Sequence, residues 1–377
     1  MFNEHDISRD ACQLYGEQAS QGYDWWWHSF TARNIETGEE KPFFIEFFLC
    51  NPELGEEGPV FGQLTENKAK GKRPSYLMVK CGAWGKDAAQ LHRFFGWKKI
   101  QVDMGVPFEV KADDCFLTET DTYGRVSISS KDAEDHPEWM CGSGEMEWNL
   151  HINKITAFNV GYGASEVMRD VQAFEMFWHA EGMKTEFDGE VIWNGVRYRV
   201  DPKTCYGYAD KNLGKDFTSP WVWISSCNLT SELTGKKLND SVFDIGGGRP
   251  KVGLLALDRK LLSAFWYEGI PYEFNFSKVW THTHTEFDCR ETDTQIIWHV
   301  EQTNRWHDKM VTDLTCEKSD MLLVNYEAPD GSRRHNRLWN GGNGRGTVEL
   351  YHDGELIDRI RVENAGCEFG EYGDAGT

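Results

Sequence analysis

Gly189-Glu190-Val191-Ile192-Trp193-Asn194-Gly195-Val196-Arg197-Tyr198-Arg199-Val200 is the stretch of sequence that decides the fold class. Two short runs that contain β-branched and aromatic residues flank the dipeptide Asn194-Gly195. Asn-Gly accepts the positive φ angles of a type I′ turn, whose twist matches that of two antiparallel strands. The stretch therefore predicts a β-hairpin over residues 189–200.

Similar hairpin signals occur near both ends of the chain. Residues 346–351 and 356–362 flank a turn that contains Asp-Gly, and residues 25–34 and 41–49 flank a Glu-Thr-Gly-Glu turn. Glu46 lies within the otherwise apolar run of 41–49. A lone Glu in a strand is usually an edge or solvent-facing residue, so Glu46 is only a reserve candidate for a buried acid.

Most of the chain has a hydrophobic period of two, with Gly or Asn-Gly turns about every ten residues. Helical candidates are few, namely 8–18, a turn at 87–95, and 164–171. Strands and helices do not alternate, which disfavours a doubly wound nucleotide-binding fold. The prediction is an all-β chain with few short helices that forms a sandwich or a barrel.

The chain of 377 residues is long enough for two domains or one large one. A seam is predicted after the Asn-Gly hairpin, which gives an N-terminal domain over 1–200 and a C-terminal domain over 201–377. The glycine-rich stretches at 246–248 and 341–346 are interpreted as loops. They do not predict phosphate binding, because neither precedes a convincing helix or a Gly-Lys-Ser/Thr motif.

Charge and cysteine usage restrict the partners and the compartment. The net charge of −21 disfavours binding to nucleic acid and to anionic membranes. The sequence contains no apolar run long enough for a membrane span and begins without a secretion signal. Its 10 cysteines are widely scattered, which favours reduced, mostly buried thiols in the cytoplasm.

The most unusual segment concentrates ionisable, amide and aromatic groups between two strand-like runs. It reads Tyr206-Gly207-Tyr208-Ala209-Asp210-Lys211-Asn212-Leu213-Gly214-Lys215-Asp216-Phe217-Thr218-Ser219-Pro220-Trp221-Val222-Trp223. The segment resembles the central signature of tocopherol cyclase-like proteins, approximately Tyr-x-Glu-Lys-Asn-Trp-Gly, a gap, Phe-Pro and Trp-x-Trp. The residues that fit this pattern are Tyr208, Lys211, Asn212, Gly214, Phe217, Trp221 and Trp223.

Further similarity to that family lies in Trp25-Trp26-Trp27, in Trp178-His179-Ala180-Glu181-Gly182 and in Asn228. The resemblance implies two lipocalin-like β-domains packed together, with a ligand cavity at or near their interface. Three positions depart from the pattern: Asp210 replaces a Glu, Leu213 a Trp and Thr218 a Pro. These departures argue against a plant-type tocopherol substrate more than they argue against the fold.

The predicted catalytic residues are Asp210, Lys211, Tyr208 and His179. Alternation places Tyr208 and Asp210 on one strand face, together with Asn212 as a substrate-binding residue. A carboxyl group buried among aromatic rings has a raised pKa, so Asp210 is the first candidate for a general acid. Lys211 could orient an oxyanion, but it faces the same cavity as Asp210 only if the strand bulges. The alternative interpretation of this segment is a purely structural corner.

Histidine and tryptophan side chains supply the other candidates. Strict alternation from Trp280 to Glu286 places His282 and His284 on one strand face, as a proton relay, a substrate-binding pair or a solvated surface. A metal site is disfavoured because the later ligand spacing of a cupin is absent. The residues expected to line the cavity and stabilise a developing cation are Trp25, Trp26, Trp27, Trp221 and Trp223.

The leading functional hypothesis is a cofactor-independent isomerase. It closes a ring on an apolar phenolic or polyene substrate by acid-assisted addition of a phenol oxygen to a C=C bond. The alternatives are a hydro-lyase that adds water to an isoprenoid or enone double bond, and a carrier without catalysis. The expected partner is an apolar aromatic or prenylated small molecule, and association of identical chains stays open.

Overall fold

The hairpin at Asn194-Gly195 forms as predicted in the computed structural model. Both turn residues have positive φ angles, 49° for Asn194 and 81° for Gly195, as a type I′ turn requires. The hairpin near the end of the chain turns in the same way at Asp353 (φ 49°) and Gly354 (φ 81°). The structure describes residues 4–103, 105–158, 176–217, 220–248, 251–252, 255–256 and 260–370.

The first half of the chain forms a twelve-stranded antiparallel sheet. Its strands are β1 (Tyr23–Asn34), β2 (Glu40–Cys50), β3 (Tyr76–Ala83), β4 (Ala89–Phe95), β5 (Ile100–Asp103), β6 (Glu109–Ala112), β7 (Cys115–Thr118), β8 (Asp121–Ile128), β9 (Gly144–Phe158), β10 (Met176–Trp193), β11 (Val196–Val200) and β12 (Gly207–Gly214). The sheet curves so that β4 also contacts β8 and β9, which gives it a barrel-like interior.

The second half forms an eleven-stranded antiparallel sheet. Its strands are β13 (Trp221–Ser226), β14 (Asn228–Ser231), β15 (Val242–Gly248), β18 (Lys260–Tyr267), β19 (Ile270–Asn275), β20 (His284–Glu291), β21 (Gln295–Thr303), β22 (Asp308–Glu317), β23 (Met321–Glu327), β24 (Arg334–His352) and β25 (Glu355–Gly370). A separate pair consists of β16 (Lys251–Val252) and β17 (Leu255–Ala256). The predicted all-β, two-barrel architecture is therefore confirmed.

The helices are short. They are α1 (Glu4–Asp10), α2 (Gln18–Gln21), α3 (Thr65–Ala69) and α4 (Ser130–Asp135), with 3-10 turns η1 (Pro52–Leu54), η2 (Trp97–Lys99), η3 (Pro137–Trp139), η5 (Val279–Thr281) and η6 (Lys318–Asp320). The prediction of one helix over 8–18 is wrong, because Asp24 accepts a hydrogen bond from the backbone of Gln13 and holds this segment extended between α1 and α2.

Two other local predictions are corrected by tertiary pairing. Residues 89–95 form strand β4 and not a helical turn, because they pair along the whole of β3. The two glycine stretches interpreted as loops belong to β15 and β24. Glycine is required there by close packing, since a Cβ at Gly246 would lie 2.5 Å from the Trp178 ring and one at Gly342 2.5 Å from the Trp84 ring. The predicted helix at 164–171 lies outside the described residues.

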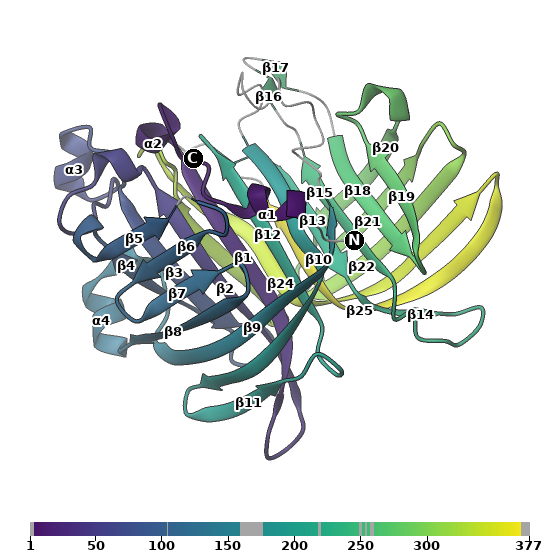
Figure 1. The fold of residues 1–377 in the computed structure, drawn as a ribbon, viewed down its shortest axis with the longest axis horizontal. Helices are drawn as coiled ribbons and strands as arrows, with labels where there is room; N and C mark the ends of the chain where they lie inside the picture. The colour runs from purple at the N-terminus through teal and green to yellow at the C-terminus, as the bar shows by residue number, and fades with distance from the viewer. Residues whose placement is uncertain are drawn as a thin grey trace.

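The two sheets pack side by side, and β10 contacts β13 and β15 where they meet (Figure 1). One hydrophobic cluster fills the interior of the first sheet, a second fills the interior of the second sheet, and a third lies between them. The chain leaves the first sheet after Gly214 and enters the second sheet at Trp221, because β12 pairs with β1 and β10 and β13 belongs to the second sheet. The seam predicted near residue 200 thus lies before the last strand of the first sheet.

The structure also bears on two expectations from the sequence, which concern membrane spans and the state of the cysteines. Within the described ranges, none of the helices combines the length and the apolar character that crossing a lipid bilayer demands. All ten cysteines are among the described residues and none is in a disulfide; six are buried and four are partly buried.

Candidate functional site

Strand β12 presents its two faces to two different interiors. Tyr208, Asp210 and Asn212 share the face toward the second sheet, where the Tyr208 hydroxyl donates to Asp210 Oδ2 (3.2 Å) and the Tyr23 hydroxyl donates to Asn212 Oδ1 (3.0 Å). Tyr23 and Tyr208 both belong to the cluster between the sheets. The alternation inferred from the sequence therefore brings this trio together at the domain interface.

The Asp210 carboxyl is held by three donors. Trp178 Nε1 donates to Oδ2 (2.9 Å), Trp25 Nε1 donates to Oδ1 (3.3 Å), and the third donor is the Tyr208 hydroxyl. The residue is 7 % exposed. Burial raises the pKa of Asp210 to about 8, although the indole of Trp178 favours its ionised form. Asp210 is thus a carboxyl group that keeps its proton at neutral pH.

A second buried carboxyl group comes from the other sheet. Asp244 lies on β15, is fully buried, and accepts a hydrogen bond from Trp223 Nε1 at Oδ1 (3.0 Å). The Trp223 ring lies 4.8 Å from the ring of Tyr208. Burial raises the pKa of Asp244 well above its ordinary value, and the neighbouring Asp210 charge raises it further.

A third interface carboxyl group, Glu368 on β25, is satisfied at both oxygens. Trp221 Nε1 donates to Oε2 (2.6 Å) and Asn340 Nδ2 donates to Oε1 (2.5 Å). Burial raises the pKa of Glu368 to about 7. Trp221 also meets Trp178 edge to face, with ring centroids 6.1 Å apart.

Glu46, kept as a reserve acid, forms a buried ion pair. Its Oε2 lies 3.0 Å from Lys80 Nζ and accepts a hydrogen bond from the Tyr326 hydroxyl (2.9 Å). Both charged side chains are fully buried. Burial lowers the pKa of Lys80 to about 8 and raises the pKa of Glu46. Glu46 therefore lies neither at a sheet edge nor in solvent, as a Glu in a strand usually does, because β2 is covered on both faces.

Lys211 lies on the opposite face of β12 from Asp210. It forms a fully buried ion pair with Asp24 of β1 and packs over the Trp26 ring at 4.3 Å. Burial raises the pKa of Asp24, and the charge of Lys211 opposes this shift. Lys211 therefore lies in the interior of the first sheet and does not join Asp210, because β12 has no bulge between the two residues.

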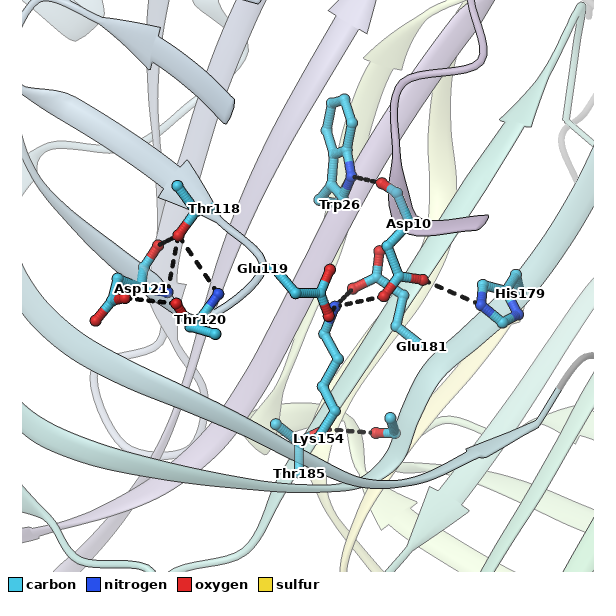
Figure 2. A network of polar contacts seen from close by, with 11 residues as sticks. Asp10, Trp26, Thr118, Glu119, Thr120, Asp121, Lys154, His179, Glu181 and Thr185 are labelled. Carbon is cyan, nitrogen blue, oxygen red and sulfur yellow. Dashed lines mark hydrogen bonds and ion pairs between the residues drawn. The ribbon is translucent and has the colours of Figure 1, made fainter. Parts of the chain in front are cut away.

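His179 belongs to the same interior. Its Nε2 lies 3.1 Å from Asp10 Oδ1, and Asp10 Oδ2 lies 2.8 Å from Lys154 Nζ (Figure 2). Lys154 also contacts Glu119 Oε1 (2.7 Å) and Glu181 Oε2 (2.8 Å). We call these five residues the Lys154 network. Burial raises the pKa of Glu119 to about 8, whereas the charges of Lys154 and His179 overcome burial and lower that of Asp10 to about 2.

The tryptophans predicted to line a cavity divide between the two interiors. Trp27 of β1, with Trp221 and Trp223, belongs to the cluster between the sheets. Trp26 faces the first interior instead, where its Nε1 donates to the Asp10 carbonyl oxygen (2.7 Å) and its ring stacks on Phe108 (5.3 Å). Consecutive residues of a strand point to opposite faces, so the Trp25-Trp26-Trp27 run cannot line one cavity.

The strand predicted around Trp280 to Glu286 is wrong in its first part. Residues 279–281 form the turn η5, and His282 has a left-handed backbone conformation (φ 49°). His284 begins β20, and its exposed imidazole lies 3.1 Å from the equally exposed Glu286. The two histidines therefore do not share a strand face, and neither belongs to the interface cluster.

A small pocket lies beside Tyr208. Its free volume is about 30 Å³, room for about two water molecules, and its lining includes Tyr208, Trp223, Ser225 and Asn364. Ser225 is the register partner of Asp244 on the neighbouring strand. In the described part of the chain, no group of three or more His, Cys, Asp or Glu side chains has an arrangement that would hold a metal ion.

Sequence reasoning missed Asp244 and Glu368 and did not assign Trp178 a role. Asp244 carries a signal, because it stands within the apolar run Val242-Phe243-Asp244-Ile245. A charged residue at an inward-facing strand position indicates a buried polar site. Glu368 carries no comparable local signal, since its partners Trp221 and Asn340 are distant in sequence.

Replacing Gly246 by Ala tests whether Trp178 is locked against the second sheet. The added Cβ would lie 2.5 to 3.0 Å from three ring atoms of Trp178, so the ring and its bond to Asp210 must move. We expect a loss of about 1–3 kcal/mol in unfolding free energy, measured by urea denaturation. Gly58→Ala, where nothing lies within 4 Å of the new Cβ, is the control. A variant as stable as wild type would contradict this packing.

Comparison with known proteins supports the fold. No protein-family model matches the chain, and no curated protein matches it. Among solved structures, kievitone hydratase from Nectria haematococca aligns over 95 % of this chain and 93 % of that chain, with 10 % identity and a TM-score of 0.50. The two chains share a fold. A Nitrosomonas europaea protein named as an AttH covers 93 % of both chains, with 12 % identity and a TM-score of 0.46.

The architecture is thus the double-domain, lipocalin-like β fold that the resemblance to tocopherol cyclase-like proteins implied. At 10 % identity the likeness concerns the fold alone. Membership in that family stays a prediction from the residues around Tyr208 and Trp223.

Proposed function

We propose that this protein is an enzyme that adds an oxygen nucleophile across a C=C bond of an apolar unsaturated small molecule, with Asp210 as the proton donor. The observation that carries the proposal is a buried carboxyl group that receives three hydrogen bonds and has a pKa of about 8. A protonated acid in a dry aromatic site can protonate an alkene carbon. The faces of Trp25, Trp178 and Trp223 stabilise the cation that develops.

In the leading version of the reaction, the nucleophile is a phenol oxygen of the substrate itself. The phenol oxygen attacks the carbon that becomes positive when Asp210 delivers its proton, and a ring closes without any change in mass. Tyr208 and Asn212 lie on the same face as Asp210 and are the residues placed to orient the substrate. The reaction is an isomerisation and requires no cofactor.

A second version, in which water is the nucleophile, is favoured by the pocket beside Tyr208. Its volume suits about two water molecules, and Ser225 and Asn364 contribute polar groups to its lining. The shared fold with a protein named kievitone hydratase is consistent with a hydro-lyase, although fold alone does not assign a reaction. The substrate would be an isoprenoid or enone.

Product mass tests the proposal and separates its two versions. Purified protein is incubated with a panel of prenylated phenols that includes kievitone, and the products are analysed by liquid chromatography and mass spectrometry. We expect a product of unchanged mass for cyclisation, or one heavier by a single water for hydration. Tight binding of these compounds without any conversion would contradict an enzyme and support a lipocalin-like carrier.

The pH dependence of turnover follows from the protonation of Asp210. The acid is active in its protonated form, and its pKa is about 8, so the rate should be constant at lower pH and fall tenfold per unit above about 8. The measurement is kcat between pH 6 and pH 10 with the substrate found above. A rate that instead rises through this interval would exclude Asp210 as a general acid.

The proposal also places the protein in a reducing compartment such as the cytoplasm. Ten cysteines, none of them in a disulfide and four of them only partly buried, support this location, because disulfides form readily in oxidising compartments. Whether identical chains associate is left to a measurement of mass in solution.

A further inference from the structure

Asp210 and Asp244 occupy equivalent settings on the two sheets. Each carboxyl group accepts a hydrogen bond from a tryptophan of its own sheet, Trp178 for Asp210 (2.9 Å) and Trp223 for Asp244 (3.0 Å). Tyr208 stands between them, because its hydroxyl donates to Asp210 while its ring packs against Trp223 at 4.8 Å. One buried carboxyl group from each domain therefore belongs to the same interface site.

The two oxygens of Asp244 differ in their surroundings. Oδ1 accepts the bond from Trp223, whereas the fully buried Oδ2 has no hydrogen bond of ordinary geometry among the described residues. The Tyr208 hydroxyl lies near this carboxyl group and favours its ionised form. A buried polar atom without a partner costs about 1–3 kcal/mol, so native proteins rarely keep one without a use. Glu368 offers the contrast within the same interface, since both of its oxygens accept bonds, from Trp221 and Asn340.

Two neighbours of Asp244, Trp223 and Ser225, line the pocket beside Tyr208. A water molecule or a substrate hydroxyl in this pocket would meet Tyr208, which donates to Asp210, and Ser225, the register partner of Asp244. Asp244 therefore has room for one further hydrogen-bond donor, and the O–H group of the nucleophile in the proposed reaction is such a donor.

We propose that Asp244 is the second catalytic carboxyl group of this site and accepts the proton that the oxygen nucleophile loses. The inference rests on the proposed function and deepens it. It assigns the two proton transfers to different domains, with donation from Asp210 on the first sheet and acceptance by Asp244 on the second. The site is then complete only when both domains contribute to it.

The proton balance of the cycle closes without a cofactor. Asp210 loses the proton of its carboxyl O–H as a C–H bond forms from the alkene electron pair. The nucleophile forms a C–O bond to the cationic carbon, and its O–H proton passes to the Asp244 carboxylate. Tyr208 then donates its hydroxyl proton to Asp210 and takes one from Asp244, which restores the starting state. Over the whole cycle the pair gives up one proton and takes back one.

The two carboxyl groups are electrostatically coupled. Burial raises the pKa of both carboxyl groups, and the charge of Asp210 raises that of Asp244 further. Two like charges in an apolar site do not ionise together, so their protons come off in steps that belong to the pair. The pair consequently retains at least one proton at neutral pH.

Turnover by Asp244→Asn provides the first test. The amide keeps an acceptor for Trp223 but cannot take a proton, so we expect kcat to fall about 100-fold or more with little change in KM. Asp358→Asn, which alters another buried carboxyl of the second sheet that bonds Ser231 and Tyr267, is the matched control and should keep wild-type turnover. Asp244→Asn with wild-type kcat and an unchanged pH profile would overturn the inference, and the proposed function would stand if Asp210→Asn were inactive.

Infrared titration of the carboxyl C=O stretch provides a second test that needs no substrate. In wild type we expect two buried carboxyl groups that titrate in separate steps. Asp210→Asn should lower the midpoint of Asp244 by about one pH unit, because the change removes the neighbouring charge that raises it. A midpoint that does not move in the folded variant would overturn the pairing. Circular dichroism establishes that each variant is folded.

Discussion

Asp210→Asn is expected to lower turnover by about two to four orders of magnitude while the protein stays folded. The amide side chain can still accept the bond from Trp178 but carries no acidic proton. Because Asn also avoids the desolvation that raises the pKa of Asp210 to about 8, the unfolding free energy should not fall. The measurements are kcat from product mass spectrometry and the midpoint of thermal unfolding.

Asp210→Glu is the matched control for this prediction. It keeps a carboxyl group at the position where tocopherol cyclase-like proteins usually have Glu, so it should retain a measurable part of the activity that Asp210→Asn loses. If Asp210→Asn turned over at the wild-type rate, Asp210 would be a structural residue and the proposed reaction would need another acid. Loss of turnover in both variants with a lowered unfolding midpoint would equally favour the structural role.

Lys154→Met is expected to destabilise the protein by about 3–5 kcal/mol near pH 8. Its ammonium group lies within 2.8 Å of three carboxyl groups, and its removal leaves Asp10, Glu119 and Glu181 buried without that cation (Figure 2). The loss should be smaller at pH 5, because protonation allows these carboxyl groups to remain buried as neutral groups. Urea denaturation followed by tryptophan fluorescence at both pH values measures it.

Two further variants test whether the loss of stability in Lys154→Met comes from the removal of a buried charge. Lys111→Met, which alters an exposed lysine of β6, should change stability by no more than about 0.5 kcal/mol. Adding Glu181→Gln to Lys154→Met should recover part of the loss, since one buried charge is removed. Equal destabilisation at pH 5 and pH 8 would contradict an electrostatic origin and indicate lost packing of the lysine stem.

The Lys154 network also explains why His179 is not part of the Asp210 site. His179 and Trp178 are consecutive residues of β10, so they face the two different interiors of the molecule. The sequence motif Trp178-His179 contains a functional candidate, but it is the indole of Trp178 that reaches Asp210. Likewise Asp210 and Lys211 are neighbours in sequence that belong to separate buried networks.

Local signals in the sequence were sufficient for the strands and for one face of the site. The Asn194-Gly195 and Asp353-Gly354 turns, the period of two, and the trio Tyr208, Asp210 and Asn212 all depend on residues close together in the chain. Hairpin register and side-chain alternation follow from turn chemistry and from the pleat of a strand, which are local properties. The sequence alone therefore determined an all-β chain and made Asp210 the first candidate for a general acid.

Only the tertiary structure decided which groups meet Asp210. Trp25, Trp178 and Asp244 come from β1, β10 and β15, and their approach depends on how two curved sheets pack through glycine contacts such as Gly246 against Trp178. The same packing buries Glu46 with Lys80 and places His284 in solvent. These outcomes rest on contacts between residues far apart in sequence, and periodicity within a single strand contains no information about them.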